Sequence, residues 1–346
     1  MMLKHLRSSH QSLIIAEVGQ NHQGKLENAL EYIHRFASAG ADVIKFQTRN
    51  NRFLFSEDAY NKPYDSENAF GPTYGEHREQ LELSPAEKRI LRAKCSEAGA
   101  LFMSTPFDEY SLELLVDLKI DLLKIASFDI GNLPFIDRIA QTGIPVVVST
   151  GGANDEQIRI SVDTILRYHD EIALLHCVSE YPCDHNHLGL QRIERFLNDY
   201  PTITIGLSDH FNGIVSGPVG YMCGARVFEK HVTLNRSWKG TDHSFALEPD
   251  GFRRFARDIK RIPEMMPPKP TESLGTEPVF KKLGKSLAAR VPLSPGDVIT
   301  LDKLTGKIFE TTYIPVRESN SILGKKTIAS IDQGMPIRYE ELSGPG

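Results

Sequence analysis

Short apolar runs rich in β-branched residues recur through the first three quarters of the chain. Strands that are buried on both faces have this appearance, because neither face has to meet water. The runs are Leu13–Ala16, Val43–Gln47, Leu101–Thr105, Leu122–Ser127, Val146–Thr150, Ile172–Val178, Ile203–Leu207 and Val227–Val232. The pattern therefore predicts eight strands.

Between these runs, apolar residues return with the spacing of helices. The predicted helices are Leu26–Ser38, Pro85–Ala98, Ser111–Leu118, Leu133–Gln141, Asp155–Tyr168, Leu188–Leu197 and Phe252–Ile262. Their ends carry the expected signals. Ser84 and Glu87 form a capping box with Pro85 at the first helical position, and Gly99 and Gly143 follow helices as stops.

Alternating buried strands and helices indicate a parallel sheet covered by helices. Eight such units fit a closed (β/α)8 barrel, the α/β architecture called a TIM barrel, better than the structural alternative of an open doubly wound sheet. The barrel domain is predicted to span residues 1–265. A proline-rich stretch without periodicity follows, so residues 266–280 are interpreted as a stiff linker. Short runs bounded by prolines and glycines then predict a small domain of strands and turns over residues 281–346.

Composition narrows the class of protein. Hydrophobic residues make up 40% and charged residues 25%, as in an ordinary globular protein, and the formal net charge of -5 argues against a nucleic-acid partner. The four cysteines form no CxxC pair, which favours reduced thiols in the cytoplasm. Neither a signal peptide nor an apolar stretch long enough for a membrane span occurs in the sequence, so we expect a cytoplasmic protein without a membrane partner.

Polar residues end the predicted strands, where a barrel of this type carries its catalytic groups. Lysines and serines predominate among them: Lys45, Lys124, Ser127, Ser149, Ser179 and Ser208. An ammonium supplies a point charge and a hydroxyl a directed donor, so this set suits a phosphate together with a carboxylate. The glycines after Ser149 let backbone amides approach the same anion. The sequence therefore predicts an anion site at the barrel mouth.

Two histidines, His210 and His231, end consecutive strands and can converge on one ion as neutral nitrogen ligands. Glu17 and Asp242 can supply oxygen nearby, which leaves positions for water and a substrate carbonyl. Two imidazoles with oxygen ligands suit manganese, or another divalent ion such as magnesium, better than a closed structural zinc site.

An ordered set of motifs resembles the sialic acid synthase family, which includes N-acetylneuraminate, legionaminic and pseudaminic acid synthases and the spore coat polysaccharide synthesis protein E. The motifs are Ile14–His22, Val43–Thr48, Ser104–Phe107, Leu123–Ser127, Ser149–Gly151, Leu175–Cys177, Tyr181-Pro182 and Ile205–His210. The tail resembles the family's antifreeze-like (SAF) domain at Lys285–Leu287, Leu293–Asp297, Leu323–Lys325 and Asp332–Gly334. The resemblance implies a homodimer in which this C-terminal domain is swapped over the partner's barrel mouth.

The resemblance also implies roles for individual residues. Those that would bind phosphoenolpyruvate are Lys45, Asn68, Lys124, Ser127, Ser149, Ser179 and Ser208. His210 and His231 would be manganese ligands, and Gln47, Tyr181 and Asp242 would surround the sugar. Glu17 and Asp129 would be the catalytic carboxylates.

Three departures from the family pattern concern the sugar end of the site. Asp129 stands where the family has a glutamate, and Ser179 stands where it has an asparagine. Lys307-Ile308-Phe309 replaces the family's Arg-Pro-Gly segment in the small domain. The resemblance therefore leaves the acceptor sugar open.

The resulting hypothesis is a condensation of phosphoenolpyruvate with an N-acetylated amino sugar similar to N-acetylmannosamine, giving a sialic-acid-type nonulosonic acid for surface polysaccharide. The metal would polarise the sugar aldehyde, and Asp129 or Glu17 would position or deprotonate water. Two alternatives stay open. One is a Schiff-base aldolase that uses Lys124 as its nucleophile, and the other is a non-catalytic sugar-binding homologue.

Overall fold

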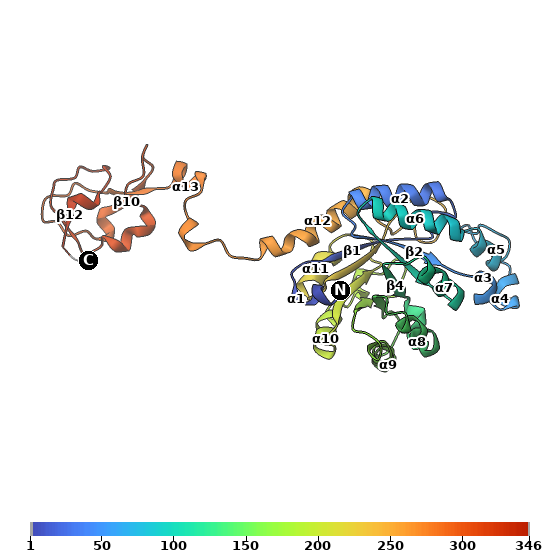
Figure 1. Cartoon of the computed structure of the whole chain (residues 1–346). Helices are drawn as coiled ribbons and strands as arrows, with labels where there is room; N and C mark the ends of the chain where they lie inside the picture. The colour runs from blue at the N-terminus through green and yellow to red at the C-terminus, as the bar shows by residue number, and fades with distance from the viewer. Residues whose placement is uncertain (1–2, 345–346) are drawn as a thin grey trace. The chain divides into compact units, whose positions relative to one another are not determined.

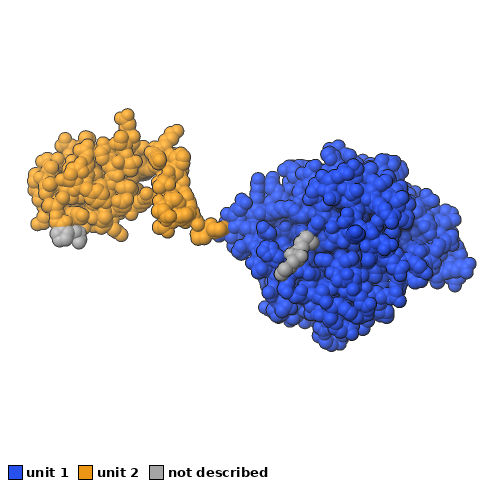
Figure 2. Space-filling view, viewed as in Figure 1, with its two compact units in different colours: residues 1–266 blue, residues 267–346 orange. Residues whose placement is uncertain are grey.

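The computed structural model describes residues 3–344 and divides the chain into two compact units, residues 1–266 and residues 267–346 (Figure 2). The division falls inside the proline-rich stretch interpreted as a linker from residue 266 to 280. That stretch is not wholly irregular, since it contains a 3₁₀ turn at Thr271–Ser273 and the start of helix α13 at Pro278–Leu283.

Unit 1 is a closed barrel of eight parallel strands in sequence order, so the TIM-barrel prediction is confirmed and the open sheet is excluded. The strands are β1 Leu13–Gly19, β2 Val43–Thr48, β3 Leu101–Pro106, β4 Leu122–Ile125, β5 Val146–Ser149, β6 Ile172–Cys177, β7 Thr204–Asp209 and β8 Val227–His231. Strand β8 pairs with β1 and closes the barrel, which brings Glu17 beside His231.

Helices surround the strands, as Figure 1 shows. The principal helix after each strand is α2 Leu26–Ser38, α6 Pro85–Glu97, α7 Glu109–Asp117, α8 Leu133–Gln141, α9 Asp155–Leu166, α10 Arg192–Asp199, α11 Ser216–Met222 and α12 Pro249–Met265. Shorter helices are α1 Leu3–Ser8 before the barrel and α3 Asn51–Leu54, α4 Glu57–Asn61 and α5 Tyr74–Glu79 between β2 and α6. The predicted capping box of α6 is present, with Ser84 accepting from the Glu87 amide.

The sequence reading missed or misplaced several elements. Helix α11 was not predicted, because its sequence Ser-Gly-Pro-Val-Gly-Tyr-Met carries weak helix formers. Helix α12 continues past Pro263 to Met265, although the apolar pattern ends at Ile262. Strand β4 ends at Ile125, and Ser127 opens a 3₁₀ turn instead of continuing the strand.

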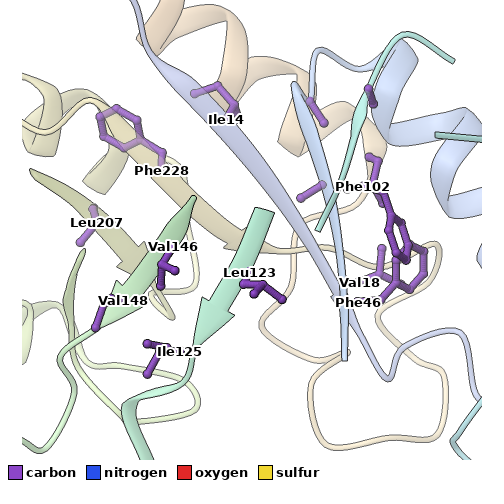
Figure 3. Close-up of a cluster of buried hydrophobic side chains, with 14 of the residues drawn as sticks. Ile14, Val18, Phe46, Phe102, Leu123, Ile125, Val146, Val148, Leu207 and Phe228 are labelled. Carbon is purple, nitrogen blue, oxygen red and sulfur yellow. The ribbon is translucent and has the colours of Figure 1, made fainter. Parts of the chain in front are cut away.

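Alternate residues of each strand point to opposite faces and form two separate clusters. The outward side chains pack under the helices, and Figure 3 labels several of them, among them Ile14, Leu123, Val148 and Phe228. The inward apolar side chains fill the lower barrel, meaning the part of the interior nearer the beginnings of the strands. Leu3 and Leu6 of α1 pack with them. This inner set comprises Leu13, Ile15, Val43, Met103, Leu122, Val147, Ala173, Leu175 and Val227.

Unit 2 has its own small core built from short elements. Strands β9 Ser286–Ala289 and β10 Leu304–Lys307 pair antiparallel, as do β11 Lys326–Thr327 and β12 Leu342–Ser343. After β9, 3₁₀ turns lie at Leu301–Lys303, Val316–Ser321 and Tyr339–Glu341. The core residues are Leu287, Ala289, Leu293, Ile299, Ile314, Ile322, Ile331 and Ile337. Assignment of this unit to the antifreeze-like (SAF) type stays a prediction. Across both units, no helix among residues 3–344 is long and apolar enough to cross a membrane.

Candidate active site

A cavity of about 320 Å³ opens at the C-terminal ends of the barrel strands. Most of the residues singled out in the sequence line it: Glu17, Lys45, Gln47, Lys124, Ser127, Ser149, Tyr181, Ser208, His210, His231 and Asp242. They come from seven of the eight strands or from the segments just beyond them. The closed barrel therefore gathers side chains that are far apart in the sequence.

Four buried charges lie at the centre of the cavity floor. The Lys45 ammonium is 2.7 Å from a carboxylate oxygen of Glu17 and 3.0 Å from one of Glu229. The Lys124 ammonium is 3.9 Å from Glu229 and donates to the Ser149 hydroxyl at 2.6 Å. Each lysine side chain is 4% exposed, so the two cations depend on these partners for compensation.

The protonation of these groups follows from burial and from their spacing. Burial opposes the charged form of Glu229, but the two lysines outweigh it and lower the pKa of that carboxyl to about 2. Burial raises the pKa of Glu17 in spite of Lys45. Burial likewise lowers the pKa of Lys124, while the pKa of Lys45 is raised because burial is outweighed by the two adjacent carboxylates. Glu17 is thus the carboxyl of this group that can hold a proton most readily.

The serine side of the cavity depends on a close backbone approach at Gly151. The Gly151 amide donates to the Ser127 hydroxyl at 3.0 Å. A Cβ at residue 151 would lie 2.2 Å from the Ser179 oxygen and 2.9 Å from the Ser127 oxygen. A side chain at residue 151 would collide with these hydroxyls, so the close approach depends on glycine. The approach of backbone amides after Ser149 to an anion stays a prediction.

The two histidines are neighbours, with ring centroids 5.2 Å apart. The Nδ1 of His231 is buried without a hydrogen-bond partner, 3.8 Å from an Asp242 oxygen, and burial lowers the pKa of this ring to about 3. His231 is therefore neutral and can offer a lone pair. His210 donates from Nδ1 to the Val178 carbonyl at 2.7 Å.

A divalent ion would find two imidazole nitrogens here. Within residues 3–344, no third histidine, cysteine or acidic residue comes close enough to complete a ligand cluster, and Glu17 is engaged by Lys45. Burial opposes protonation of His210, but Cys177 and the Val178 carbonyl raise its pKa, so an ion would displace that proton. The donor set fits an ion that keeps water or substrate in its remaining positions.

A chain of polar contacts leads from the cavity floor toward its rim. The Gln47 amide donates to Glu17 at 2.8 Å, and Arg49 donates to the Gln47 oxygen at 2.6 Å. Across the cavity the Tyr181 ring packs against His210 with centroids 4.0 Å apart. The residues expected around the sugar therefore lie on two sides of one space.

Three predicted site residues do not line the cavity. Asn68 accepts from the Gly240 amide at 2.9 Å and supports a neighbouring loop. Asp129 lies in the 3₁₀ turn after β4 and accepts from Asn132 at 3.0 Å. Ser179 is exposed, although its hydroxyl stands beside Gly151 at the edge. Of the two candidate catalytic carboxylates, only Glu17 lines the cavity.

The sequence reading overlooked Glu229, Cys177, Arg49 and Arg78, which all line the cavity. A signal for Glu229 was available, since Val227, Glu229 and His231 alternate along β8 and must share its inner face. The next residue, Lys230, points to the outer face of the barrel and pairs with Asp209 at 2.6 Å.

A closed barrel with buried charges and histidines at its strand ends has the arrangement of a barrel enzyme. Residues 2–269 match the NeuB family, and the chain belongs to that family. It is 33% identical over 338 residues to the N-acetylneuraminate-9-phosphate synthase of Homo sapiens, covering 97% of this chain and 94% of that protein.

Two further relatives agree. The N,N'-diacetyllegionaminic acid synthase of Legionella pneumophila is 30% identical over 342 residues, which is 97% of this chain and 96% of that protein. The crystal structure of N-acetylneuraminic acid synthetase from Leptospira borgpetersenii has a TM-score of 0.68 at 30% identity, covering 76% of this chain and 89% of that one. The chain is thus a transferase of the nonulosonic acid synthase class, and the non-catalytic alternative loses its support.

Proposed function

We propose that the protein condenses phosphoenolpyruvate with the open-chain form of an N-acetylated amino sugar, giving a nonulosonic acid and phosphate. The observation that carries the proposal is the presence of a buried lysine pair and a neighbouring imidazole pair in one cavity. An anion site beside two neutral-nitrogen ligands matches a reaction between an enol phosphate and an aldehyde.

Phosphoenolpyruvate would bind at Lys45, Lys124, Ser149 and Ser208. Lys124 is the less compensated lysine, because its carboxylate partner is 3.9 Å away, so it has the greater capacity to pair with an incoming anion. Lys124 donates to the Ser149 hydroxyl, and both side chains line the cavity. These groups would hold the enol phosphate so that its C3 faces the acceptor.

The acceptor would lie along Gln47, Tyr181 and Asp242. In the reaction, C3 of the enol forms a bond to the aldehyde carbon, and water adds to C2. The bond between C2 and the phosphate oxygen then breaks, and phosphate leaves. Glu17 is the carboxyl positioned to move a proton in these steps, because it lines the cavity and burial raises its pKa.

We propose that His210 and His231 would hold a divalent ion, with manganese preferred over magnesium because of the two nitrogen ligands. A bound ion would supply Lewis-acid polarisation of the sugar aldehyde. Asp242, near His231, would orient water or sugar hydroxyls at this end of the cavity.

We further propose that the protein is a homodimer with swapped C-terminal domains, which light scattering would test.

The test is release of phosphate from phosphoenolpyruvate by the purified chain with manganese and a panel of N-acetylated hexosamines. Mass spectrometry of the product should show a nine-carbon keto acid, and EDTA should abolish turnover. Phosphate release that is absent for every sugar of the panel would contradict the proposal.

One observation favours a second candidate, a Schiff-base aldolase. Burial lowers the pKa of Lys124, as a nucleophilic amine requires. Borohydride with pyruvate should then trap a covalent adduct on Lys124, and EDTA should leave activity intact. The synthase proposal predicts the opposite result for both measurements.

A further inference from the structure

A buried ion pair lies behind the two histidines, outside the cavity. Lys230 donates to a carboxylate oxygen of Asp209 at 2.6 Å, and the two side chains are 1% and 0% exposed. Neither residue lines the cavity, so neither charge is placed to bind a substrate. Asp209 directly precedes His210 in the chain. Lys230 directly precedes His231, so the pair joins the two segments that carry the proposed ion ligands.

Stability alone gives little reason to keep such a pair. The desolvation of two charges offsets most of their mutual attraction, and replacement of a buried ion pair by uncharged side chains of similar volume is often neutral. A buried pair of this kind is better explained where it specifies one geometry. The contacts of Asp209 and Lys230 indicate which geometry that is.

The pair joins β7 to β8 at the last position where their backbones are in register. Asp209 is the final residue of β7, and its partner in the register is Lys230 of β8. Residue 210 lies beyond β7, where the pairing with β8 has ended. The ion pair therefore fixes the two strand ends at the point where His210 leaves the sheet.

Phe211, on the other side of His210, contacts the same pair through its backbone. The Phe211 amide donates to one Asp209 oxygen at 2.9 Å, and the Phe211 carbonyl accepts from the Lys230 ammonium. The Ser216 hydroxyl, at the start of α11, donates to the other Asp209 oxygen. The residues before and after His210 are thus both fixed by the ion pair.

The imidazoles lie on the opposite face of the same strand ends. Side chains alternate between the two faces, so the residue that follows each member of the outer pair points to the cavity. The rings of His210 and His231 line that cavity, with centroids 5.2 Å apart. The separation of the strand ends therefore sets the separation of the two nitrogen ligands.

We propose that Asp209 and Lys230 are positioning residues for the histidine pair. Their ion pair fixes the ends of β7 and β8 so that His210 and His231 can both reach one divalent ion. In its consequence for binding, the inference rests on the proposed ion site. Residues that orient metal ligands without touching the metal typically change its affinity by about 10- to 100-fold.

The diagnostic variant is the double substitution Asp209→Asn, Lys230→Met. It removes both charges together, so that neither is left unpaired, and the asparagine oxygen can still accept from the Phe211 amide. Urea denaturation should show that the variant is folded. Calorimetry with manganese should give a Kd about 10- to 100-fold above that of the wild type. At saturating manganese, the KM for phosphoenolpyruvate should stay at the wild-type value. Lys230→Arg keeps the charge and should retain most of the affinity for manganese.

The double substitution Glu82→Gln, Lys88→Met is the matched control. It removes another buried ion pair, in which the nitrogen and oxygen are 3.3 Å apart and the side chains are 12% and 5% exposed. Glu82 and Lys88 do not line the cavity. The Kd of this control for manganese should equal that of the wild type. An unchanged Kd in the diagnostic variant, or an equal rise in the control, would overturn the proposal.

A crystal structure of the metal-free diagnostic variant separates this inference from the proposed reaction. The ring centroids of His210 and His231 should lie farther apart than the 5.2 Å of the wild type. Weaker binding of manganese with both rings unmoved would reject the positioning role. A wild type that binds no divalent ion would reject the proposed ion site, whereas displaced rings in the variant would still support the role of the ion pair.

Discussion

Two layers of the barrel interior, separated by two residues along each strand, have opposite chemistry. The lower layer is apolar and includes Ile15, Val43, Leu122, Val147 and Val227. Two residues further along the same strands stand Glu17, Lys45, Lys124, Ser149 and Glu229. Both layers are buried, so burial does not distinguish them.

The difference lies in what satisfies each layer. Apolar side chains in the lower layer need only contact one another, and they contribute stability through burial and close packing. In the upper layer every charge needs a partner, and ion pairs of this kind are weak net contributors to stability. The comparison indicates that the lower layer holds the barrel together, while the upper layer keeps its charges for binding.

The largest effect should follow from Lys45→Met, which leaves Glu17 and Glu229 without their nearest cation. Removal of one partner from a buried ion pair destabilises a protein by about 3–5 kcal/mol. We expect a loss of that size in the free energy of unfolding, measured by urea denaturation. Phosphate release should fall by at least about 1,000-fold, because the substrate's anion contact is lost as well.

Lys94→Met is the control for this change. Lys94 pairs with Glu97 on the exposed surface of α6, where an ion pair contributes about 0–1 kcal/mol. Its stability and activity should stay near those of the wild type. A Lys45→Met protein that keeps wild-type stability would show that the upper layer does not depend on mutual compensation.

Leu122→Ala tests the lower layer directly beneath Lys124. Leu122 is fully buried, and truncation of a buried leucine costs about 2–5 kcal/mol through lost burial and a residual cavity. We expect this loss in urea denaturation, with KM for phosphoenolpyruvate within about threefold of the wild type at temperatures where the variant is folded. A large rise in KM with little loss of stability would reverse the assigned roles of the two layers.

Much of this layering was available in the sequence. The alternation along each strand places Lys45, Lys124 and Ser149 on the face of their apolar predecessors, which is why the reading of strand ends found them. Glu229 follows the same rule, since it lies two residues after Val227 and two before His231, whereas Lys230 between them lies on the outer face with Asp209.

Other features depend on tertiary contacts that no local pattern carries. Helix α11 was missed because it contains Gly217, where a Cβ would come within 2.4 Å of the Phe255 ring. Close packing against α12 requires glycine there, although glycine disfavours a helix. Arg78 was missed for a related reason, since it comes from a short helix in the long segment between β2 and β3.

Ser149→Ala should separate function from stability within the upper layer. The Ser149 hydroxyl accepts from Lys124, and its removal leaves a flexible ammonium that can still reach Glu229 and the Ile125 carbonyl. Phosphate release should fall by about 10- to 100-fold, as for one lost hydrogen bond to a charged substrate. The free energy of unfolding should change by no more than about 1 kcal/mol. A larger stability loss without loss of activity would make Ser149 a structural residue.

His22 provides the smallest and most specific test, through the pH dependence of stability. His22 is buried just beyond the end of β1, and its Nδ1 accepts a hydrogen bond from the Gly24 amide. Burial, together with the charge of Lys88, lowers the pKa of this imidazole from 6.5 to about 3. The folded state keeps this ring neutral while the unfolded state takes up a proton, so stability is complete above about pH 6.5 and declines as the pH falls toward 3. We expect His22→Gln to remove about 1 kcal/mol of the stability loss between about pH 6 and pH 5. The control is His34→Gln at an exposed position, which should leave the pH profile of urea denaturation unchanged. Equal profiles for His22→Gln and the wild type would mean that His22 is not held neutral.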